Sequence, residues 1–414
     1  MKANTKRHGG YLFALMWVTL THLGTSSAQL RTGLDVLVQS DFAPLKHKRL
    51  ALIANATSRD AMGKSSLALF QKNQLDLRII FAPEHGFQIL DEAGRKISDD
   101  TLSNGLKVIS LYGKTKQPTP DMLADIDAIV FDIQDIGTRC YTYISTMFLA
   151  MQTAEQCGKE FIILDRPNPI APIEADGMML EINFISFVGQ VHVPFIHALT
   201  IGEIALWIQQ EVMPALKLNV VKMENYSRHK FADEDSTWKS RFVPPSPNIQ
   251  SVEAMILYPT TVLLEGTNVS EGRGTDLPFE QVGAPFIDGK KLKDALGTQQ
   301  GVEVQAVTFT PKSQKGRSTS PKFEGKACGG VRFHITAREK VKPFELAVSL
   351  LTALHKLYPK QVVWNKDFFD KLAGTSRLRE MIQQGKTPDV ILNAARESRV
   401  GFEQKSRAIL LYAQ

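Results

Sequence analysis

Short apolar runs separated by amphipathic stretches occupy the N-terminal two-thirds of the chain. Each run is rich in Val, Ile, Leu and Phe and short enough for a strand, whereas the stretches between them have helical periodicity. The predicted strands are RLALIAN (49–55), LRIIFA (77–82), KVISLYG (107–113), AIVFDIQ (128–134) and FIILDRP (161–167), and the helices include SSLALFQKN (65–73) and YISTMFLAMQTAEQCG (143–158). Nearly continuous apolar strands alternating with helices predict a parallel sheet covered on both faces, in a doubly wound, Rossmann-like α/β domain.

The pattern changes after the turn-rich stretch RFVPPSPNIQ (241–250). Gly, Thr and Pro become dense, and the later elements are less regularly alternated. They are the predicted strands EVQAVTFTP (303–311) and GGVRFHIT (329–336) and the predicted helices ELAVSLLTALHKLYP (345–359) and SRLREMIQQG (376–385). We therefore expect a Rossmann-like domain at 29–245 and a smaller α+β domain at 246–414.

Residues 1–28 have the organisation of a secretory signal peptide. A basic start precedes the apolar run YLFALMWVTLTHLG, and TSSA supplies small residues suited to cleavage after Ala28. The apolar run is shorter than the roughly 20 residues that span a bilayer. The sequence thus predicts a secreted, periplasmic protein that has no membrane span once the signal is cleaved.

The charge of the chain gives little reason to expect nucleic acid as a partner. Cleavage would leave 46 Lys and Arg against 43 Asp and Glu, a net charge of +3 in place of +6. No dense Lys/Arg stripe with interleaved aromatic residues is present. The locally basic stretch TPKSQKGRSTSPK (310–322) is interpreted as a solvated loop.

Polar side chains follow four of the predicted strands, and ligands of open α/β sheets bind at the carboxyl ends of strands. These residues are Glu84 and His85; Tyr112; Asp132, Gln134 and Asp135; and Asp165, Arg166 and Asn168. No G-x-G-x-x-G follows the first strand, and GKSS (63–66) lacks the first glycine of a phosphate-binding loop. We therefore expect a site at this edge of the sheet that uses no nucleotide cofactor.

Seven stretches in order resemble one family, labelled DUF1343 and typified by the exo-β-N-acetylmuramidase NamZ. They are FAPEHGF (81–87), SLYG (110–113), FDIQDIGTRCYTYISTM (131–147), LDRPNPI (164–170), LTIGEIA (199–205), PPSPNI (244–249) and LLEGTNVSEGRGTDLPFEQVGAPFID (263–288). The resemblance implies an exo-acting glycosidase that releases N-acetylmuramic acid from the non-reducing ends of peptidoglycan fragments, muropeptides or disaccharides. It also implies an active site in the cleft between a Rossmann-like and an auxiliary domain, without a cofactor.

Glycoside hydrolysis usually needs two carboxyl groups, one of which protonates the leaving oxygen. Glu84 follows an apolar strand in a Pro-Glu-His-Gly turn and matches the glutamate to which the family resemblance assigns catalysis, so we expect it to be the general acid. The second carboxyl group is left open among Asp135, Asp165, Glu265 and Glu271. Retention or inversion of the anomeric configuration, and assistance by the substrate's acetamido group, are open as well.

Recognition of N-acetylmuramic acid requires a partner for its lactyl carboxylate. A guanidinium matches a carboxylate through two parallel hydrogen bonds. The candidate arginines are Arg139, Arg166 and Arg273, and the other candidate sugar-binding residues are His85, Asn168, Asn248 and Asn268.

Two other classes of protein are compatible with these residues. A metal-dependent hydrolase could use Glu84, His85, Asp132 and Asp135, although no H-E-x-x-H spacing occurs and we expect no metal. A non-catalytic sugar-binding protein of the cell envelope would keep the arginines and asparagines but would not need the Glu84 carboxyl group.

Overall fold

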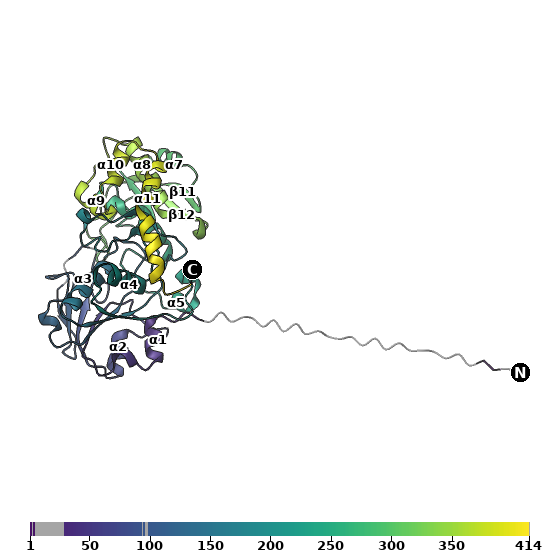
Figure 1. Cartoon of the computed structure of the whole chain (residues 1–414). Helices are drawn as coiled ribbons and strands as arrows, with labels where there is room; N and C mark the ends of the chain where they lie inside the picture. The colour runs from purple at the N-terminus through teal and green to yellow at the C-terminus, as the bar shows by residue number, and fades with distance from the viewer. Residues whose placement is uncertain (2, 5–28, 93, 96–97, 414) are drawn as a thin grey trace.

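The computed structural model describes residues 1, 3–4, 29–92, 94–95 and 98–413, so nearly all of the predicted signal peptide lies outside the described residues. The chain folds into two stacked bodies. The first carries α1 to α5, and the second carries α7 to α10 with β11 and β12 (Figure 1). None of the described helices combines the length and the apolar character that crossing a membrane requires.

A seven-stranded sheet forms the centre of the first body. Its strands are β1 (Leu50–Ala54), β2 (Leu77–Ala82), β3 (Asp100–Thr101), β4 (Lys107–Ser110), β5 (Ala128–Asp132), β6 (Glu160–Leu164) and β9 (Lys217–Val221). They lie in the order β3-β4-β2-β1-β5-β6-β9, and all pairs are parallel except β3 with β4. Without β3, this is the 3-2-1-4-5-6 order of Rossmann folds, in which the direction of winding reverses between β1 and β5.

Alternate side chains of the strands enter two separate cores, one on each face of the sheet. Ala51 and Ile53 of β1 pack with α3 (Tyr143–Gln156) and α4 (Ile201–Val212). Leu50 and Leu52 of the same strand pack with α1 (Gly33–Gln39) and α2 (Ser66–Lys72). Because the side-chain period of a strand is two, a strand with five buried residues must be covered on both sides. The predicted doubly wound α/β domain is confirmed.

The second body is built on a three-stranded antiparallel sheet. Its strands are β10 (Gln281–Ala284), β11 (Val302–Phe309) and β12 (Cys328–Ile335), in the order β10-β12-β11. The helices around it are α7 (Gly289–Leu296), α8 (Pro343–Leu357), α9 (Lys366–Ala373) and α10 (Arg377–Gln383), and α6 (Val252–Thr261) packs against α8. The predicted smaller domain is therefore present beside the Rossmann-like one, and the structure shows that its sheet is antiparallel.

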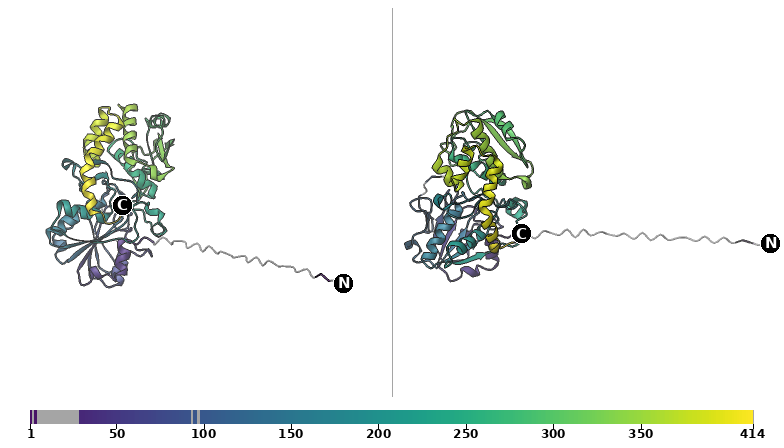
Figure 2. Two further views of the ribbon diagram at one scale, coloured as in Figure 1. Left: turned by 45° about the vertical axis from the view of Figure 1, so that its right-hand side comes forward. Right: turned by 45° about the horizontal axis from the view of Figure 1, so that its top comes forward.

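The end of the chain returns from the second body to the first. The long helix α11 (Pro388–Lys405) runs down to the first body and packs against β7 (Asp176–Met179), the partner of β8 (Pro194–Ile196) (Figures 1 and 2). Near the chain end, the Tyr412 hydroxyl donates to Oδ2 of Asp165 at 2.6 Å and accepts from the backbone N–H of Met223 at 2.8 Å. The C-terminal segment consequently joins the two bodies.

Arg139 joins the two bodies from within. Its fully buried guanidinium donates through Nη1 to the carbonyls of Met178 and Val193, at 2.8 and 2.9 Å. Nη2 donates to the carbonyls of Leu372 and Ala373 at the end of α9, at 3.4 and 2.5 Å. Burial lowers the pKa of Arg139 to about 10. Arg139, one of the three arginines that the sequence offered as candidates for binding substrate, therefore bonds instead to backbone carbonyls of β7, of the residue before β8, and of α9.

We expect Arg139→Met to lower the free energy of unfolding by about 3 kcal/mol or more, because four carbonyls lose their donor and each unsatisfied buried group costs about 1–3 kcal/mol. Arg139→Lys should fall between this variant and the wild type, since an ammonium cannot reach all four oxygens. Urea unfolding followed by circular dichroism measures both. Arg407→Met, at an exposed position, should change the value by less than about 0.5 kcal/mol. Equal stability of the Arg139 and Arg407 variants would contradict this role.

Candidate active site

A cavity of about 550 Å³ lies between the two bodies, at the carboxyl ends of β2 and β4. Loops of the first body and α6, the glycine-rich segment and a basic loop of the second body form its walls. The lining residues that carry polar or aromatic groups include Glu84, His85, Glu92, Tyr112, Tyr141 and Thr142 from the first body, and Tyr258, Glu265, Glu271, Arg273, Phe279 and Arg317 from the second. The size is within the range of small-molecule sites in proteins.

Glu84 is placed by the tight turn that ends β2. His85 and Gly86 have φ values of +68° and +76°, in the left-handed region that non-glycine residues rarely adopt. The turn buries Glu84 to 6% exposure. Its Oε1 accepts from the backbone N–H of Gly94 at 2.8 Å, and its Oε2 accepts from the hydroxyl of Thr142 at 2.6 Å. Strain in the backbone is therefore used to hold one carboxyl group between two donors.

The two hydrogen-bond donors to Glu84 differ in whether they allow the carboxyl oxygen that they contact to carry a proton. A backbone N–H can only donate, so Oε1 is committed as an acceptor. The Thr142 hydroxyl can donate to Oε2 or, after rotation, accept from it, so Oε2 is the oxygen that can carry and release a proton. Tyr112 lies beside this group, and burial together with the charge of Glu84 raises the pKa of its hydroxyl.

His85 faces the same cavity as a neutral imidazole. Its Nδ1 lies 2.7 Å from the carbonyl oxygen of Asp91, which can only accept, so Nδ1 carries the proton. Burial lowers the pKa of His85 in spite of the nearby Glu84. The second ring nitrogen, Nε2, has no hydrogen-bond partner among the described residues and can accept a hydrogen bond from a sugar hydroxyl.

A cluster of charges forms the opposite wall, in the second body. Arg273 donates to Oε1 of Glu265 from Nε and Nη2, at 3.1 and 2.7 Å, and its Nε lies 3.4 Å from Oε1 of Glu271. The ammonium of Lys322 donates to Oε2 of Glu271 at 2.9 Å and to the carbonyls of Leu264 and Val269. The guanidinium also stacks 4.9 Å from the ring centre of Phe279.

The two glutamates of this cluster, Glu265 and Glu271, differ in the number of cations that lie beside each carboxyl group. Burial alone would raise the pKa of Glu271, but Lys322 and Arg273 lower it. For Glu265, burial and the charge of Glu271 raise the pKa in spite of Arg273. Glu265 also keeps Oε2 without a hydrogen-bond partner among the described residues, and 21% of its side chain is exposed. Glu265 is thus the member of the pair that is open to a ligand.

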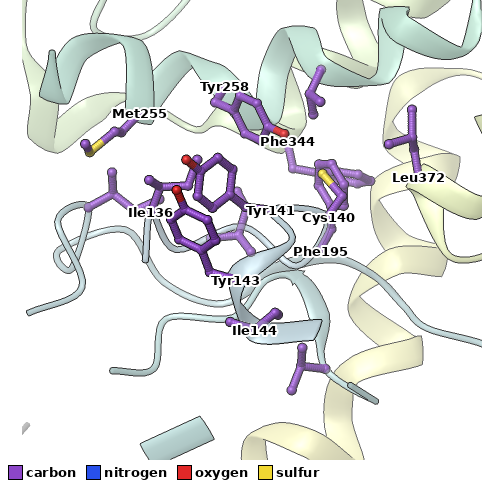
Figure 3. Packing of buried hydrophobic residues seen from close by; sticks show 14 of the residues in the cluster. Ile136, Cys140, Tyr141, Tyr143, Ile144, Phe195, Met255, Tyr258, Phe344 and Leu372 are labelled. Carbon is purple, nitrogen blue, oxygen red and sulfur yellow. The ribbon is translucent and has the colours of Figure 1, made fainter. Parts of the chain in front are cut away.

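Aromatic rings connect these two walls. Tyr141 packs edge-on against Tyr143 and Tyr258, with ring centroids 4.9 and 5.9 Å apart, and Figure 3 shows its ring between the other two. The hydroxyls of Tyr141 and Tyr143 both donate to the carbonyl of Pro245, at 2.9 and 2.6 Å. The rings of Tyr141 and Tyr258 give the cavity an aromatic side.

Of the predicted site residues, Glu84, His85, Glu265, Glu271 and Arg273 line this cavity. Seven others do not, and they make internal contacts. Asp135 accepts from the N–H of Gly137 and lies 3.4 Å from His197, Arg166 pairs with Asp132 at 2.6 Å, and Arg139 bonds to the carbonyls described above.

The three asparagines outside the cavity wall hold loops together. Asn168 donates to the carbonyl of Leu199, and Asn268 exchanges hydrogen bonds with Gln361 and Val363. Asn248 donates to the carbonyl of Arg317 at 2.8 Å. The further candidate Asp165 is fully buried and accepts from Thr200, Gly202 and Tyr412. The strand ends of β5 and β6 thus stabilise the fold, and those of β2 and β4 face the cavity.

Sequence reasoning missed Thr142, Tyr258, Phe279 and Arg317 as lining residues. Arg317 lies in the stretch 310–322, which was expected to be a solvated loop; part of that loop instead forms a wall of the cavity. No local spacing marked these positions, because their neighbours in the site are distant in the sequence.

The ligands suggested for a metal-dependent hydrolase are dispersed. Asp132 pairs with Arg166, and Asp135 lies beside His197. Within the part of the chain that the structure describes, no three His, Cys, Asp or Glu side chains converge as metal ligands.

The sequence matches known proteins over nearly its whole length. Two family profiles match, "Exo-beta-N-acetylmuramidase NamZ, N-terminal" at 50–253 and its C-terminal counterpart at 256–412. The peptidoglycan β-N-acetylmuramidase NamZ of Bacillus subtilis (strain 168) is 40% identical over 392 residues, covering 93% of this chain and 92% of that protein.

Two crystal structures of DUF1343 family proteins from Bacteroides fragilis NCTC 9343 are also similar. One is 32% identical with a TM-score of 0.84, covering 93% of this chain and 99% of the other. The second is 28% identical with a TM-score of 0.73, covering 94% of this chain and 100% of the other. With both family domains matched in order, the chain belongs to the exo-β-N-acetylmuramidase NamZ family of glycosidases, also labelled DUF1343.

Proposed function

We propose that the protein releases N-acetylmuramic acid from the non-reducing ends of peptidoglycan fragments, in the cavity between the two bodies and with Glu84 as the general acid. Membership of the family supports the reaction, and the B. subtilis relative is named for it. The observation that carries the assignment of Glu84 is its pair of donors, one of which commits Oε1 while the other leaves Oε2 able to hold a proton.

In this proposal Glu84 delivers its Oε2 proton to the glycosidic oxygen as the bond to the anomeric carbon breaks, and water supplies the hydroxyl group that the released N-acetylmuramic acid carries at that carbon. The Thr142 hydroxyl then turns to donate to the new carboxylate and stabilises it. Glu265 is the favoured second carboxyl group, because Glu271 is engaged through both oxygens whereas Oε2 of Glu265 is open. Aromatic rings such as Tyr141 and Tyr258 supply surfaces on which the apolar face of a sugar can pack.

The predicted signal peptide also leads us to propose where the enzyme acts. Its removal would place the enzyme outside the cytoplasm, in the compartment that contains peptidoglycan fragments.

We expect Glu84→Gln to lower kcat on 4-nitrophenyl N-acetyl-β-muraminide by about 10²- to 10⁴-fold, the usual contribution of a general acid. The glutamine oxygen still accepts from Gly94, so the variant should unfold at the same temperature as the wild type. Release of 4-nitrophenol and of N-acetylmuramic acid measures the rate. Glu303→Gln, at an exposed position of β11, is the matched control and should keep full activity.

The outcomes of this experiment separate the remaining classes of function. A Glu84→Gln variant with the wild-type rate would assign the acid role to another carboxyl group. Binding of N-acetylmuramic acid without turnover by the wild type would support a sugar-binding protein. Loss of turnover on treatment with a chelator would favour a metal-dependent hydrolase.

A second prediction concerns the dependence of the rate on pH. If Glu265 acts as a carboxylate, lowering the pH inactivates it, and its raised pKa moves this loss above the pH expected for an ordinary glutamate. We expect the acidic limb of kcat/KM to show an apparent pKa above 4.5 and to disappear from the residual activity of Glu265→Gln. An unchanged profile in Glu265→Gln, with the limb lost in Glu271→Gln instead, would assign the role to Glu271.

A further inference from the structure

The described residues that line the cavity carry more carboxyl groups than guanidinium groups. Among the described residues, its lining includes the carboxyl groups of Glu84, Glu92, Glu265 and Glu271 but only two guanidiniums, those of Arg273 and Arg317. A substrate that carries a carboxylate is repelled by such a wall unless a cation without a carboxylate partner is available to it. The recognition of the lactyl group therefore depends on which cation is uncompensated.

Arg273, the only arginine of the sequence-based candidates that reaches the cavity, is already paired. Its guanidinium lies at 2.7 Å from Glu265 and 3.4 Å from Glu271. The ammonium of Lys322 uses its three N–H groups in hydrogen bonds to Glu271 and to two backbone carbonyls. To bind a further carboxylate, either cation would have to leave a partner that is itself largely buried, which costs free energy.

Arg317 differs from Arg273 and Lys322 because it has no carboxylate partner among the described residues. Its Nε donates to the carbonyl of Pro247 at 3.0 Å, and within the described residues it forms no ion pair. Its two terminal nitrogens therefore retain donors for a carboxylate, and the half-buried side chain lines the cavity.

The backbone around Arg317 is held on both sides. The N–H of Gln314 donates to the carbonyl of Ser318 at 2.8 Å, and the N–H of Ser318 donates back to Gln314 at 2.9 Å, which closes a tight loop. Asn248 donates to the carbonyl of Arg317. The guanidinium is thus presented by an ordered loop, so that little conformational entropy is lost on binding.

The same loop is tied to the segment that holds Glu84. The backbone N–H and the hydroxyl of Thr319 donate to Glu92 at 2.7 and 2.9 Å. Gly94, two residues beyond Glu92, donates to Glu84. The loop that carries Arg317 and the Glu84 carboxyl group, which belong to different bodies, thus accept or donate hydrogen bonds at two neighbouring positions of the chain, Glu92 and Gly94.

We infer that Arg317 is the residue that selects N-acetylmuramic acid, by binding the lactyl carboxylate of the sugar while Glu84 protonates its glycosidic oxygen. This inference rests on the proposed function. It replaces Arg139, Arg166 and Arg273 in the role that the sequence assigned to one of them.

We expect Arg317→Gln to lower kcat/KM for 4-nitrophenyl N-acetyl-β-muraminide by about 10²- to 10³-fold, mainly through KM, because a charge-assisted bidentate contact is lost. Hydrolysis of the muraminide methyl ester, whose lactyl group is uncharged, should change less than threefold. The kcat/KM of Arg317→Lys for the charged muraminide should lie between those of the wild type and Arg317→Gln. Lys315→Gln removes an exposed charge from the same loop as a matched control and should leave both rates unchanged.

Inhibition by free N-acetylmuramic acid provides a readout that does not require turnover. Its inhibition constant, or its dissociation constant measured by calorimetry, should rise at least tenfold in Arg317→Gln, whereas that of N-acetylglucosamine should not change. Equal losses on the charged substrate and its ester, or unchanged affinity for N-acetylmuramic acid, would overturn the inference. Wild-type protein that fails to hydrolyse the muraminide would instead refute the proposed function, and the two failures are therefore distinguishable.

Discussion

The arrangement of this molecule depends on a buried arginine, Arg139, which has no carboxylate partner in the part of the chain that the structure describes. Arg139 binds the carbonyls of Met178 and Val193 in one segment and of Leu372 and Ala373 at the end of α9 in another. The negative end of the α9 dipole and the four oxygens compensate its charge. Gly374 follows α9 with φ of +74°, and a side-chain carbon there would lie 2.3 Å from Nη2 of Arg139.

This joint also fixes the candidate active site. Cys140, Tyr141 and Thr142 follow Arg139 directly and line the cavity, and Leu372 lines it from the other body. Since Thr142 is the donor to Oε2 of Glu84, a shift of the joint would move that donor. The scaffold and the candidate acid are therefore coupled through three consecutive residues.

Three glutamates around one cavity acquire different properties from their neighbours. Glu84 has neutral donors, Glu271 shares two cations, and Glu265 pairs with one cation through a single oxygen. Enzymes assign acid and base roles to chemically identical groups through such differences in environment. The distribution of cations also leaves Arg317 as the arginine of the cavity that has no acidic partner among the described residues.

The sequence by itself determined the parallel strands, the presence of a smaller α+β domain and the turn that carries Glu84 and His85, because burial patterns and turn chemistry are local. It left out α6 and α11 among the elements, and it placed Asp135, Arg139 and Arg166 near substrate. Only the tertiary structure decided which charges are compensated, since the partners are distant in sequence: Thr142 is 58 residues from Glu84, and Ala373 is 234 residues from Arg139. A carboxyl group or a guanidinium has the same chemistry wherever it stands in the sequence, and its role depends on the groups that the fold places around it.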